Sequence, residues 1–559
     1  MPTMTKEKEI QPAGKDRAEV LLDRFKELLS GRQNFESYWQ TLHDYFYLEA
    51  NDFNKSYYPG SELDSSYLWD STTIETADVL ASGFMNYLTP PSAKWFRLRT
   101  KNPALGENKA VADFLENVAE EVNYTLNRSN FYDQIFPSYK SSGVYGTSVL
   151  LEEEDIHDDA RFYTLPLKQV AIVEDAAGRA AEYYIEFEYT AFQAASRFGV
   201  EKLSTPLQEE LKTGRNDNKK HKFVLFIGKR NIREIGKQDR KNLPVEAVWI
   251  ERDAKKIIDE GGYNEFPAMC HRFDKRPFIT WGFSPAMKAL PFARILNAIA
   301  KTSLRSMMKH TDPAIALPEN SFIMPFNMNP RAVNYYKKGS MDDKSLITLS
   351  NTGDPGVGLT GIEYYSTKVK KLMYNDVFLA FENLTKQMNN PEVMERINEK
   401  MTLLGPAVGR FTAEVLNPII IRTVGILFRR GKLPEPPQEI IEDPTYEIDF
   451  VGQLAQAQKR SELNSIVTGL TMVGQMAQIV PDVLDKVNTD RTIDEIWSVT
   501  GAPVQLLRDD SEIQALREAR AEQAAQVNQM QQMGSGAAIA KTASEAERNF
   551  RESKGGQTV

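Results

Sequence analysis

Two long helical patterns, separated by a stretch rich in turn residues, constrain the fold more than any other feature of the sequence. The first pattern runs from Ser284 to His310, and the second begins near Ile362 and runs to about Met388. Between them, the loop-rich sequence from Glu319 to Gly361 is about forty residues long and contains the run NTGDPGVG, which is typical of turns and not of helices. A connection of this length is rarely passive inside a compact domain. The sequence therefore predicts an antiparallel helix pair that carries a separate functional tip.

The first of these helices is expected to be cationic on one side. At about 100° per residue its basic side chains lie within an arc of about 80°, and they are Arg294, Lys301, Arg305 and Lys309. The opposite side carries apolar residues that would pack, namely Ile295, Leu296, Ile299 and Met307. For a single helix taken alone, an ordinary amphipathic surface helix explains this pattern. A ring of such helix pairs would instead form a tube with cations available to a polyanion inside.

Strand-like sequence fills the middle of the chain. Residues 161–189 alternate apolar and polar side chains around a turn at 175–179, which predicts an antiparallel meander. Residues 222–228 and 245–251 are also strand-like. The block 215–256 is basic, and we favour the solvated face of a small antiparallel sheet over a phosphate-binding patch.

Helical patterns dominate the rest of the chain. Near the start they cover residues 17–50, 72–88 and 108–129. Another begins at Asn390-Pro391 and runs toward Arg430, with kinks expected at Gly405-Pro406 and Asn417-Pro418. Residues 452–533 are helical and rich in Gln and Ala, and 534–559 have the composition of a disordered tail.

Composition excludes several classes of protein. The 68 Lys and Arg residues are outnumbered by 77 Asp and Glu residues, and a net charge of −9 argues against a chain that coats nucleic acid with a cationic surface. A single cysteine, Cys270, excludes a disulfide within the chain and a cysteine-rich zinc site, and it fits a reducing, cytosolic compartment. The first residues lack the apolar run of a signal peptide. The run 463–481 has helical spacing with polar residues inside it, which indicates an amphipathic helix and not a membrane span.

No motif of a nucleotide-dependent or nucleophilic enzyme is present in convincing form. Gly228-Lys229 and Gly236-Lys237 lack the following Ser or Thr of a phosphate-binding loop. Ser284 lies in the run GFSPA, which resembles a nucleophile elbow, but its place before Pro285 favours a helix N-cap.

The remaining candidate groups are weaker still. Cys270 and His271 would point to opposite faces of a strand, which does not suit a nucleophile and its base. The acidic residues between Glu152 and Asp159 could hold a divalent cation, although a solvated loop is the more frequent outcome. We therefore predict no catalytic residue, no metal site and no cofactor.

Several ordered motifs resemble those of the portal, or head-to-tail connector, proteins of short-tailed bacteriophages. The family run D-S-T…A…L-A-S…L-T-P-P-S…W-F is present from Asp70 to Phe96. Similar blocks follow in the family's order at 143–154, 261–273, 281–297, 387–437 and 450–463. The resemblance covers roughly residues 17–465, and none of its motifs is catalytic. One departure lies at Asn389-Asn390-Pro391, where the family usually has Thr-Ala-Thr.

The resemblance implies an elongated α+β subunit that is mainly α. It would have long stem helices, a small antiparallel β wing region and a C-terminal helical crown or barrel. Its parts would be the wing or hip at 1–285 with the β meander at about 160–260, the first stem helix at 286–312, the clip at 313–362, the second stem helix at 363–386, the tunnel loop and long kinked helix at 387–440, the helical crown or barrel at 441–533 and a flexible tail at 534–559.

The resemblance also implies a function that is physical and not enzymatic. Portal subunits form a dodecameric ring at a unique capsid vertex, through which double-stranded DNA is packaged and ejected. A net acidic tube with sparse cationic rings would make weak, salt-sensitive contacts with the DNA. The candidate DNA-channel residues are Lys301, Arg305, Asn389, Asn390, Arg396 and Lys400. An intersubunit salt bridge is a milder role open to the charged ones.

The partners that follow from the resemblance are further copies of the chain, double-stranded DNA, the major capsid protein, the scaffolding protein, the terminase large subunit, the tail adaptor protein, and internal core or ejection proteins. The chain would have no membrane span. It would reside in the virion, and in the host cytoplasm during assembly. Two alternatives stay open: a nucleic-acid-processing enzyme of a phage, and a structural head-tail adaptor without a DNA-translocating channel.

Overall fold

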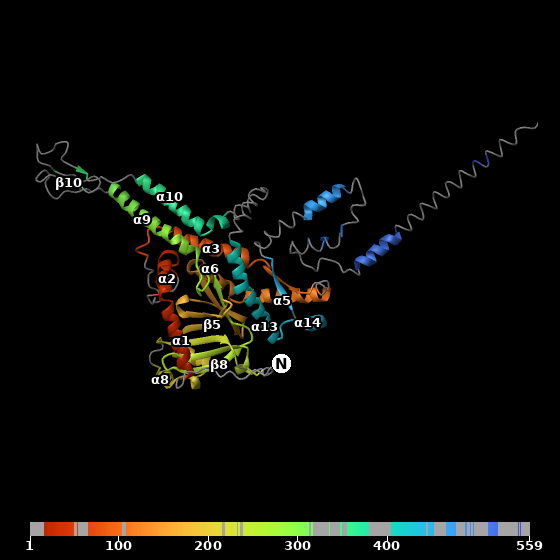
Figure 1. Cartoon of the computed structure of the whole chain (residues 1–559), viewed down its shortest axis with the longest axis horizontal. Helices are drawn as coiled ribbons and strands as arrows, with labels where there is room; N and C mark the ends of the chain where they lie inside the picture. The colour runs from red at the N-terminus through yellow and green to blue at the C-terminus, as the bar shows by residue number, and fades with distance from the viewer. Residues whose placement is uncertain are drawn as a thin grey trace, which may run out of the picture. The chain divides into compact units, whose positions relative to one another are not determined.

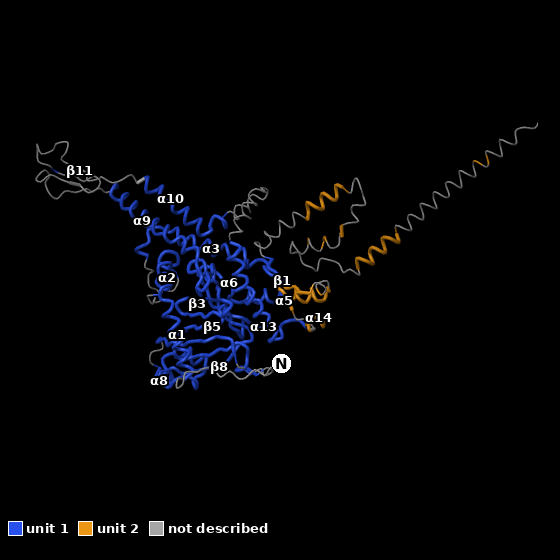
Figure 2. The backbone as a smooth tube through the Cα atoms, in the orientation of Figure 1, with its two compact units in different colours: residues 1–97, 118–435, 448–458 blue, residues 98–117, 436–447, 459–559 orange. Residues whose placement is uncertain are grey.

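The computed structural model confirms a mainly helical α+β fold (Figure 1). It describes residues 16–49, 53, 65–102, 105, 108–214, 218–231, 233–234, 239–311, 315–316, 335, 347–348, 355–379, 404–442, 445–451, 466–476, 487–488, 492–493, 496, 512–523, 546 and 548. The chain divides into two compact units (Figure 2). The first comprises residues 1–97, 118–435 and 448–458, and the second comprises residues 98–117, 436–447 and 459–559.

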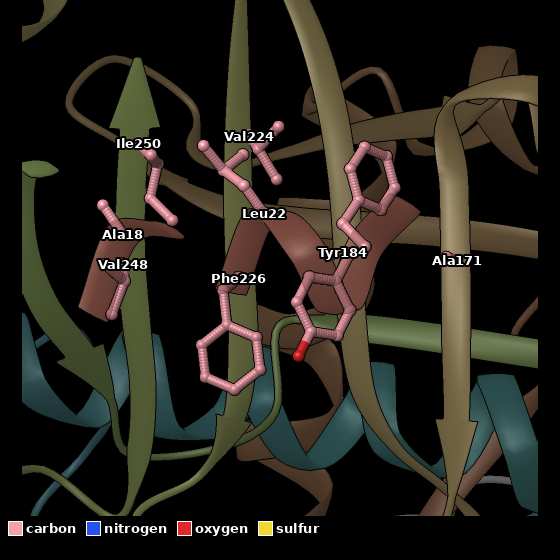
Figure 3. Packing of buried hydrophobic residues seen from close by; sticks show 9 residues of the cluster. Ala18, Leu22, Ala171, Tyr184, Val224, Phe226, Val248 and Ile250 are labelled. Carbon is pink, nitrogen blue, oxygen red and sulfur yellow. The ribbon is translucent and has the colours of Figure 1, made fainter. Parts of the chain in front are cut away.

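A five-stranded antiparallel sheet forms the larger β part of the first unit. Its strands follow chain order: β4 (Val170–Glu174), β5 (Ala180–Thr190), β6 (Lys220–Lys229), β7 (Val245–Glu251) and β8 (Lys256–Tyr263). Helix α1 (Arg17–Gly31) packs its apolar stripe on one face, with Leu22 and Phe25 buried in a cluster that includes Tyr184 and Val224 (Figure 3). Helices α7 (Ala191–Phe198) and α8 (Thr205–Thr213) lie between β5 and β6 in the chain.

A three-stranded antiparallel sheet has the order β3 (Asp159–Leu165), β2 (Thr147–Asp155), β9 (Ala268–Arg272). The predicted single meander over 161–189 is therefore wrong in its connectivity. Of the three strands in this range, β3 pairs with β2 in the smaller sheet, whereas β4 and β5 belong to the larger one. The predicted turn at 175–179 is confirmed. Asp175 Oδ1 accepts hydrogen bonds from the backbone N–H groups of Ala177 and Arg179, at 2.9 and 2.8 Å.

Helices surround these sheets in the first unit. They are α2 (Gln33–Phe46), α3 (Thr72–Leu88) and α6 (Phe131–Tyr145), and α5 (Lys109–Arg128) continues from the second unit's residues into the first. Strand β1 (Phe96–Thr100) pairs with β12 (Tyr446–Phe450). In the second unit the described helices also include α14 (Gln438–Glu442), 466–476 and 512–523, which lie in the predicted crown region 441–533 or just before it.

The predicted helix pair is α9 (Pro285–Thr311) and α10 (Pro355–Leu372), which lie side by side within the first unit (Figures 1 and 2). Ser284 is the N-cap of α9, as predicted, because its Oγ accepts a hydrogen bond of 3.0 Å from the backbone N–H of Met287. The same hydroxyl donates to the carbonyl of Val144 at 2.6 Å, so it is fully engaged in structure and not available as a nucleophile. Between the helices, the two-residue strands β10 (Ile315–Ala316) and β11 (Ile347–Thr348) pair antiparallel.

Helix α10 begins earlier than predicted, because part of the NTGDPGVG run is helical. Its first residue is Pro355, and it contains Gly356 and Gly358. A proline fits the first turn of a helix, where its missing N–H is not needed. A Cβ on Gly358 would collide with the Ser303 side chain on α9, so this glycine lets the two helices approach closely.

The same helix ends earlier than predicted. Leu372 is its last residue, Tyr374 has a positive φ of 59°, and a new helical stretch covers 375–379. A tyrosine carries no sequence signal for the left-handed conformation, which glycine or asparagine normally adopts. The rest of the predicted helix, to Met388, lies outside the described residues.

A further helix spans Leu404–Arg429, and its second half is α13 (Asn417–Arg429). In its middle, Thr412–Leu416 has π-helical geometry, with the Asn417 N–H donating to the carbonyl of Thr412. Pro418 follows and has no N–H, so the predicted irregularity at Asn417-Pro418 coincides with this π turn. We call this element the 404–429 helix.

The 404–429 helix is, within the described part of the chain, the one helix long and apolar enough to cross a membrane, with a mean hydropathy of 1.5 in its most apolar window. Half of that window is buried inside the structure, and Ile419, Ile420 and Ile426 are fully buried in the first unit. The same composition serves the core helix of a globular unit.

Candidate nucleic-acid interface

The predicted division of α9 into a packing side and a cationic side is present. Its buried residues include Ala293, Leu296 and Ala300, on the side opposite the basic stripe. Arg294, Arg305 and Lys309 are exposed to solvent. The prediction was wrong for Ile295, which was placed on the packing side but is 41% exposed. This residue lies at the edge of the predicted apolar arc that is nearest to the basic stripe.

Lys301 differs from the other cations of the stripe. It is half-buried, and its Nζ lies 5.4 Å from the centroid of the Trp69 ring. This is a cation–π contact with a side chain from a segment more than two hundred residues earlier in the chain. By contrast, no ion pair joins Arg305 or Lys309 to any other residue that the structure describes.

Helix α10 adds cations that the sequence analysis did not single out. Lys368, Lys370 and Lys371 are exposed near its C-terminal end, and Lys368 Nζ lies 5.5 Å from the centroid of the Tyr364 ring. Positive charge in the last turn also stabilises a helix through its dipole. The run KVKK was the available signal, but a helix C-terminus is a common place for lysines and therefore indicates no site by itself.

Four of the six candidate channel residues lie outside the described residues. They are Asn389, Asn390, Arg396 and Lys400. The structure therefore brings Lys301 and Arg305 together on α9, one helical turn apart, and leaves the others as predictions.

The helix pair is anchored to the first unit through aromatic and small residues. Phe378, just after α10, packs edge-on against Phe84 of α3 with 5.7 Å between ring centroids. Its ring fills the place where Gly83 would carry a Cβ. Beneath α3, the buried Lys140 Nζ pairs with Glu49 at 2.8 Å and with Asp78. These contacts fix the segment just after α10 to α3, and α3 in turn to α6.

Most acids of the cluster from Glu152 to Asp159 have partners, which lie on α5, on α7, and on and just after the 404–429 helix. The Asp159 carboxylate accepts hydrogen bonds from Arg430 and Lys432, at 2.8 and 2.7 Å. Although burial alone would raise it, these bonds hold the pKa of Asp159 below its usual value. Across the described residues, no group of His, Cys, Asp and Glu side chains is arranged to hold a metal ion. Four acids of the cluster, Glu153, Glu154, Asp158 and Asp159, therefore serve as ion-pair partners.

Glu152 is the most buried member of this cluster. Its Oε1 accepts a 2.9 Å hydrogen bond from Thr423, and its backbone carbonyl accepts one of 3.1 Å from Arg422 Nε. Burial raises the pKa of Glu152 to about 8, against the lowering effects of Arg422 and Thr423. Arg422 is itself fully buried and also donates to the carbonyl of Glu265 at 3.0 Å. The Glu152 carboxyl group therefore has a structural role, since it is enclosed between β2 and the 404–429 helix.

A serine and a histidine in hydrogen-bond contact were not foreseen. Ser142 Oγ lies 2.6 Å from His271 Nδ1, and both side chains are buried. Burial lowers the pKa of His271 to about 3, so the ring stays neutral. Cys270 lies on the other face of β9, and burial raises its pKa to about 12. Because these groups are enclosed in the core, they form a packing arrangement and not a nucleophile with its base.

The described residues of the basic block 215–256 lie on β6, β7, β8 and their connections, and several of their charges are paired. Lys222 pairs with Glu186 at 2.8 Å, and Arg240 pairs with Asp259 at 2.9 Å. Arg230 donates to the carbonyls of Leu243 and Gly261. These pairings favour a structural role for the basic residues over a phosphate-binding patch, and the choice between the two stays a prediction.

Comparison with known proteins gives a consistent result along the chain. A family model described as bacteriophage head to tail connecting protein matches residues 18–507. The chain is 29% identical over 537 residues to the portal protein of Salmonella phage epsilon15, covering 95% of this chain and 96% of that protein. It is also 29% identical over 521 residues to the probable portal protein of Bordetella phage BPP-1, covering 93% of this chain and 94% of that protein. The similarity thus extends over nearly the whole length and is not confined to one motif.

Proposed function

Because the chain belongs to the family of bacteriophage head-to-tail connecting proteins, we propose that it is the portal of a phage capsid. It forms a ring at a unique vertex, through which double-stranded DNA is packaged and later ejected. The ring is also where the terminase docks, and afterwards the tail. The single observation that carries this conclusion is the family match over residues 18–507, supported by two relatives of matching length that are named as portal proteins.

The parts of the subunit follow from the helix pair. We assign the stem to α9 and α10, with the clip formed by the residues between them, so that the second stem helix starts at Pro355 and not at 363. The wing comprises the residues before α9, including both larger sheets. The tunnel loop and long helix fall within 387–440, and the crown within 441–533. The order of helices, sheets and loop along the chain supports this assignment.

The mechanism is electrostatic guidance without chemistry. A chain of net charge −9 repels DNA over most of its surface, which keeps the polymer from adhering to the channel. A few exposed cations in each subunit, with Arg305 and Lys309 foremost among the described residues, make weak contacts that salt weakens further. Such contacts are repeated around a ring, so no single one has to be strong. ATP hydrolysis is assigned to the terminase, and the portal itself is assigned no enzymatic activity.

The partners follow from the same role. Portal proteins are components of the virion at the capsid vertex, and this one is proposed to assemble as a dodecamer in the host cytoplasm. Its contacts would be the major capsid and scaffolding proteins, the terminase large subunit, the tail adaptor protein and internal core or ejection proteins. No membrane span is assigned, because the 404–429 helix is half buried and carries a fully buried arginine, Arg422.

Negative-stain electron microscopy of the purified full-length protein tests the proposal. A ring with an axial hole is the expected result. A closed particle without a hole would contradict the channel and favour a plain structural adaptor. A parallel incubation with DNA and magnesium tests the enzymatic alternative, since a portal leaves the DNA uncut.

A further inference from the structure

The cationic face of α9 is partly covered by a segment that precedes α3. This segment, residues 65–71, is called the strap from here on. Asn297 on α9 holds it with both ends of its side-chain amide. Its Oδ1 accepts a 2.7 Å hydrogen bond from the backbone N–H of Trp69, and its Nδ2 donates a 3.0 Å bond to the carbonyl of Tyr67. The amide thus takes the place of a neighbouring β-strand for this short piece of backbone.

The far end of the strap is fixed at the start of α3. Asp70 Oδ1 accepts a 2.9 Å hydrogen bond from the backbone N–H of Thr72, and Ser71 Oγ donates a 2.7 Å bond to Glu75. These are the contacts of a helix start, where the first N–H groups need acceptors. The strap is therefore tethered at both ends, by α3 on one side and by Asn297 on the other.

The position of Asn297 decides where the indole of Trp69 lies. Lys301 is four residues further along α9 and hence on the same face as Asn297. Its Nζ lies 5.4 Å from the Trp69 ring centroid, and Trp69 itself is 37% exposed. One turn beyond, Arg305 is exposed and the strap does not extend to it. The stripe therefore contains one cation that is engaged and others that face solvent.

We infer that Asn297 is a positioning residue that docks the strap on α9, holds Lys301 against Trp69, and so withholds Lys301 from a polyanion. Arg294, Arg305 and Lys309 then remain as the cations of α9 that are available to phosphate groups. The part concerning DNA rests on the proposed function, while the docking of the strap does not. Lys301 thus differs from Arg294, Arg305 and Lys309, although the helical period places all four on one face.

The docking is tested without DNA by acetylating lysines of the full-length protein and measuring the rate at each site by mass spectrometry. Lys309, which is exposed on α9, is the internal reference, and Lys288 is a second one that is also exposed but lies 4.0 Å from the Asp274 carboxylate. A cation–π contact of ordinary strength should slow Lys301 by about two- to five-fold relative to them. Asn297→Ala should remove most of this difference and leave Lys288 and Lys309 unchanged.

Two matched variants separate docking from general loosening of α9. Thr302→Ala changes an exposed residue whose hydroxyl bonds only to the carbonyl of Ala298 in its own helix, and it should leave the Lys301 rate as in wild type. Trp69→Phe keeps a ring and should retain part of the protection, whereas Trp69→Ala should lose it. A Lys301 that is acetylated as fast as Lys309 in the wild type, or at the same rate with and without Asn297, overturns the inference.

Binding to a short DNA duplex at several salt concentrations tests the consequence. Arg305→Ala should reduce the slope of log affinity against log salt by about one for each phosphate that is no longer neutralised, and Lys301→Ala should leave it unchanged. In the Asn297→Ala background, Lys301→Ala should now reduce the slope. If the acetylation contrast holds but no variant alters DNA binding, the strap stands and the proposed contact of α9 with DNA is wrong.

Discussion

Two long helices of the first unit treat their charged side chains in opposite ways. Helix α9 buries small and apolar residues and exposes Arg294, Arg305 and Lys309. The 404–429 helix is apolar enough to resemble a membrane span, yet it buries Arg422 completely and pairs Glu414 with Arg272 at 2.6 Å. The difference shows that the number of charges on a helix says little about their role. Charges kept in water remain available to a partner, whereas charges placed against a sheet hold the fold together.

Among the tests of this comparison, Arg422→Ala is expected to have the largest effect on the free energy of unfolding. Loss of the guanidinium leaves the buried carbonyls of Glu152 and Glu265 without their donor, and we expect the free energy of unfolding to fall by about 3–5 kcal/mol. Urea unfolding of the full-length protein, followed by circular dichroism, measures it. The matched control, Arg305→Ala, should change the same quantity by no more than about 0.5 kcal/mol. Equal effects of the two variants would contradict the contrast between the helices.

A smaller effect is expected where α9 and α10 touch. Gly358→Ala introduces a methyl group against Ser303, which should cost about 1–3 kcal/mol of stability because the two backbones must separate. Gly361→Ala is the control, since its nearest neighbour would be Ile299 at an ordinary 3.5 Å. This control should be neutral or slightly stabilising, because alanine favours a helix by about 1 kcal/mol over glycine. Thermal unfolding midpoints of the two variants decide between these outcomes.

The buried acid predicts a pH dependence with a defined sign. The pKa of Glu152 is raised to about 8 from 4.5, so the folded state holds a proton that the unfolded state has lost. Stability from this group therefore falls as pH rises between these values, by up to about 1.4 kcal/mol per pH unit. The pKa of His271 is lowered to about 3 from 6.5, which makes stability fall as pH drops within that range. Between pH 6.5 and about 8, Glu152 therefore changes the stability with pH, whereas His271 does not.

Glu152→Gln tests this sign. The amide imitates the neutral acid and should flatten the dependence of unfolding free energy on pH within that window. Chemical denaturation at a series of pH values provides the measurement. His271 should still cause the loss of stability at lower pH in both proteins. If the wild type shows no loss of stability across the window relative to Glu152→Gln, Glu152 is ionised in the fold and the prediction is wrong.

The substitution Lys309→Ala is expected to have the smallest effect on the free energy of unfolding but a clear effect on DNA binding. Lys309→Ala should change stability by less than about 0.5 kcal/mol while lowering the salt slope of DNA binding by about one. Lys432→Ala is the counterpart near the 404–429 helix, where it removes a 2.7 Å hydrogen bond to the buried Asp159. That variant should cost about 1 kcal/mol and leave the salt slope unchanged. If Lys432→Ala lowered the salt slope and Lys309→Ala did not, the proposed contact between α9 and DNA would be wrong.

The start and the faces of α9 were predictable because they depend on local signals. A proline at the first helical position, a serine before it and a helical repeat of apolar residues are all read within one segment. The acidic cluster could be located in the same way, but its role could not. Glu152 and its partner Arg422 are separated by 270 residues, and no local pattern indicates that they meet.

Glycine misled the prediction of α10 for a related reason. The propensity of Gly356 and Gly358 opposes a helix, and only the contact with Ser303 on α9 makes the second glycine favourable there. The two hydrogen bonds from the Asn297 amide to the strap could not be predicted for the same reason, because Trp69 lies 228 residues away in the chain. Contacts between distant segments thus account for what the sequence did not reveal, both in the fold and in the candidate site.

The π turn at Thr412–Leu416 makes one stretch of this gene unusually tolerant of a change in length. A π turn holds one residue more than an α turn while both flanking segments keep their facing directions. Loss of a single codon within it would therefore restore a regular α-helix, with Phe411 and Arg422 still directed toward the core. The same loss a few residues later would rotate all that follows by about 100° and turn the buried arginine toward water. Among related genes, single-residue length differences in this helix should accordingly cluster at these five positions.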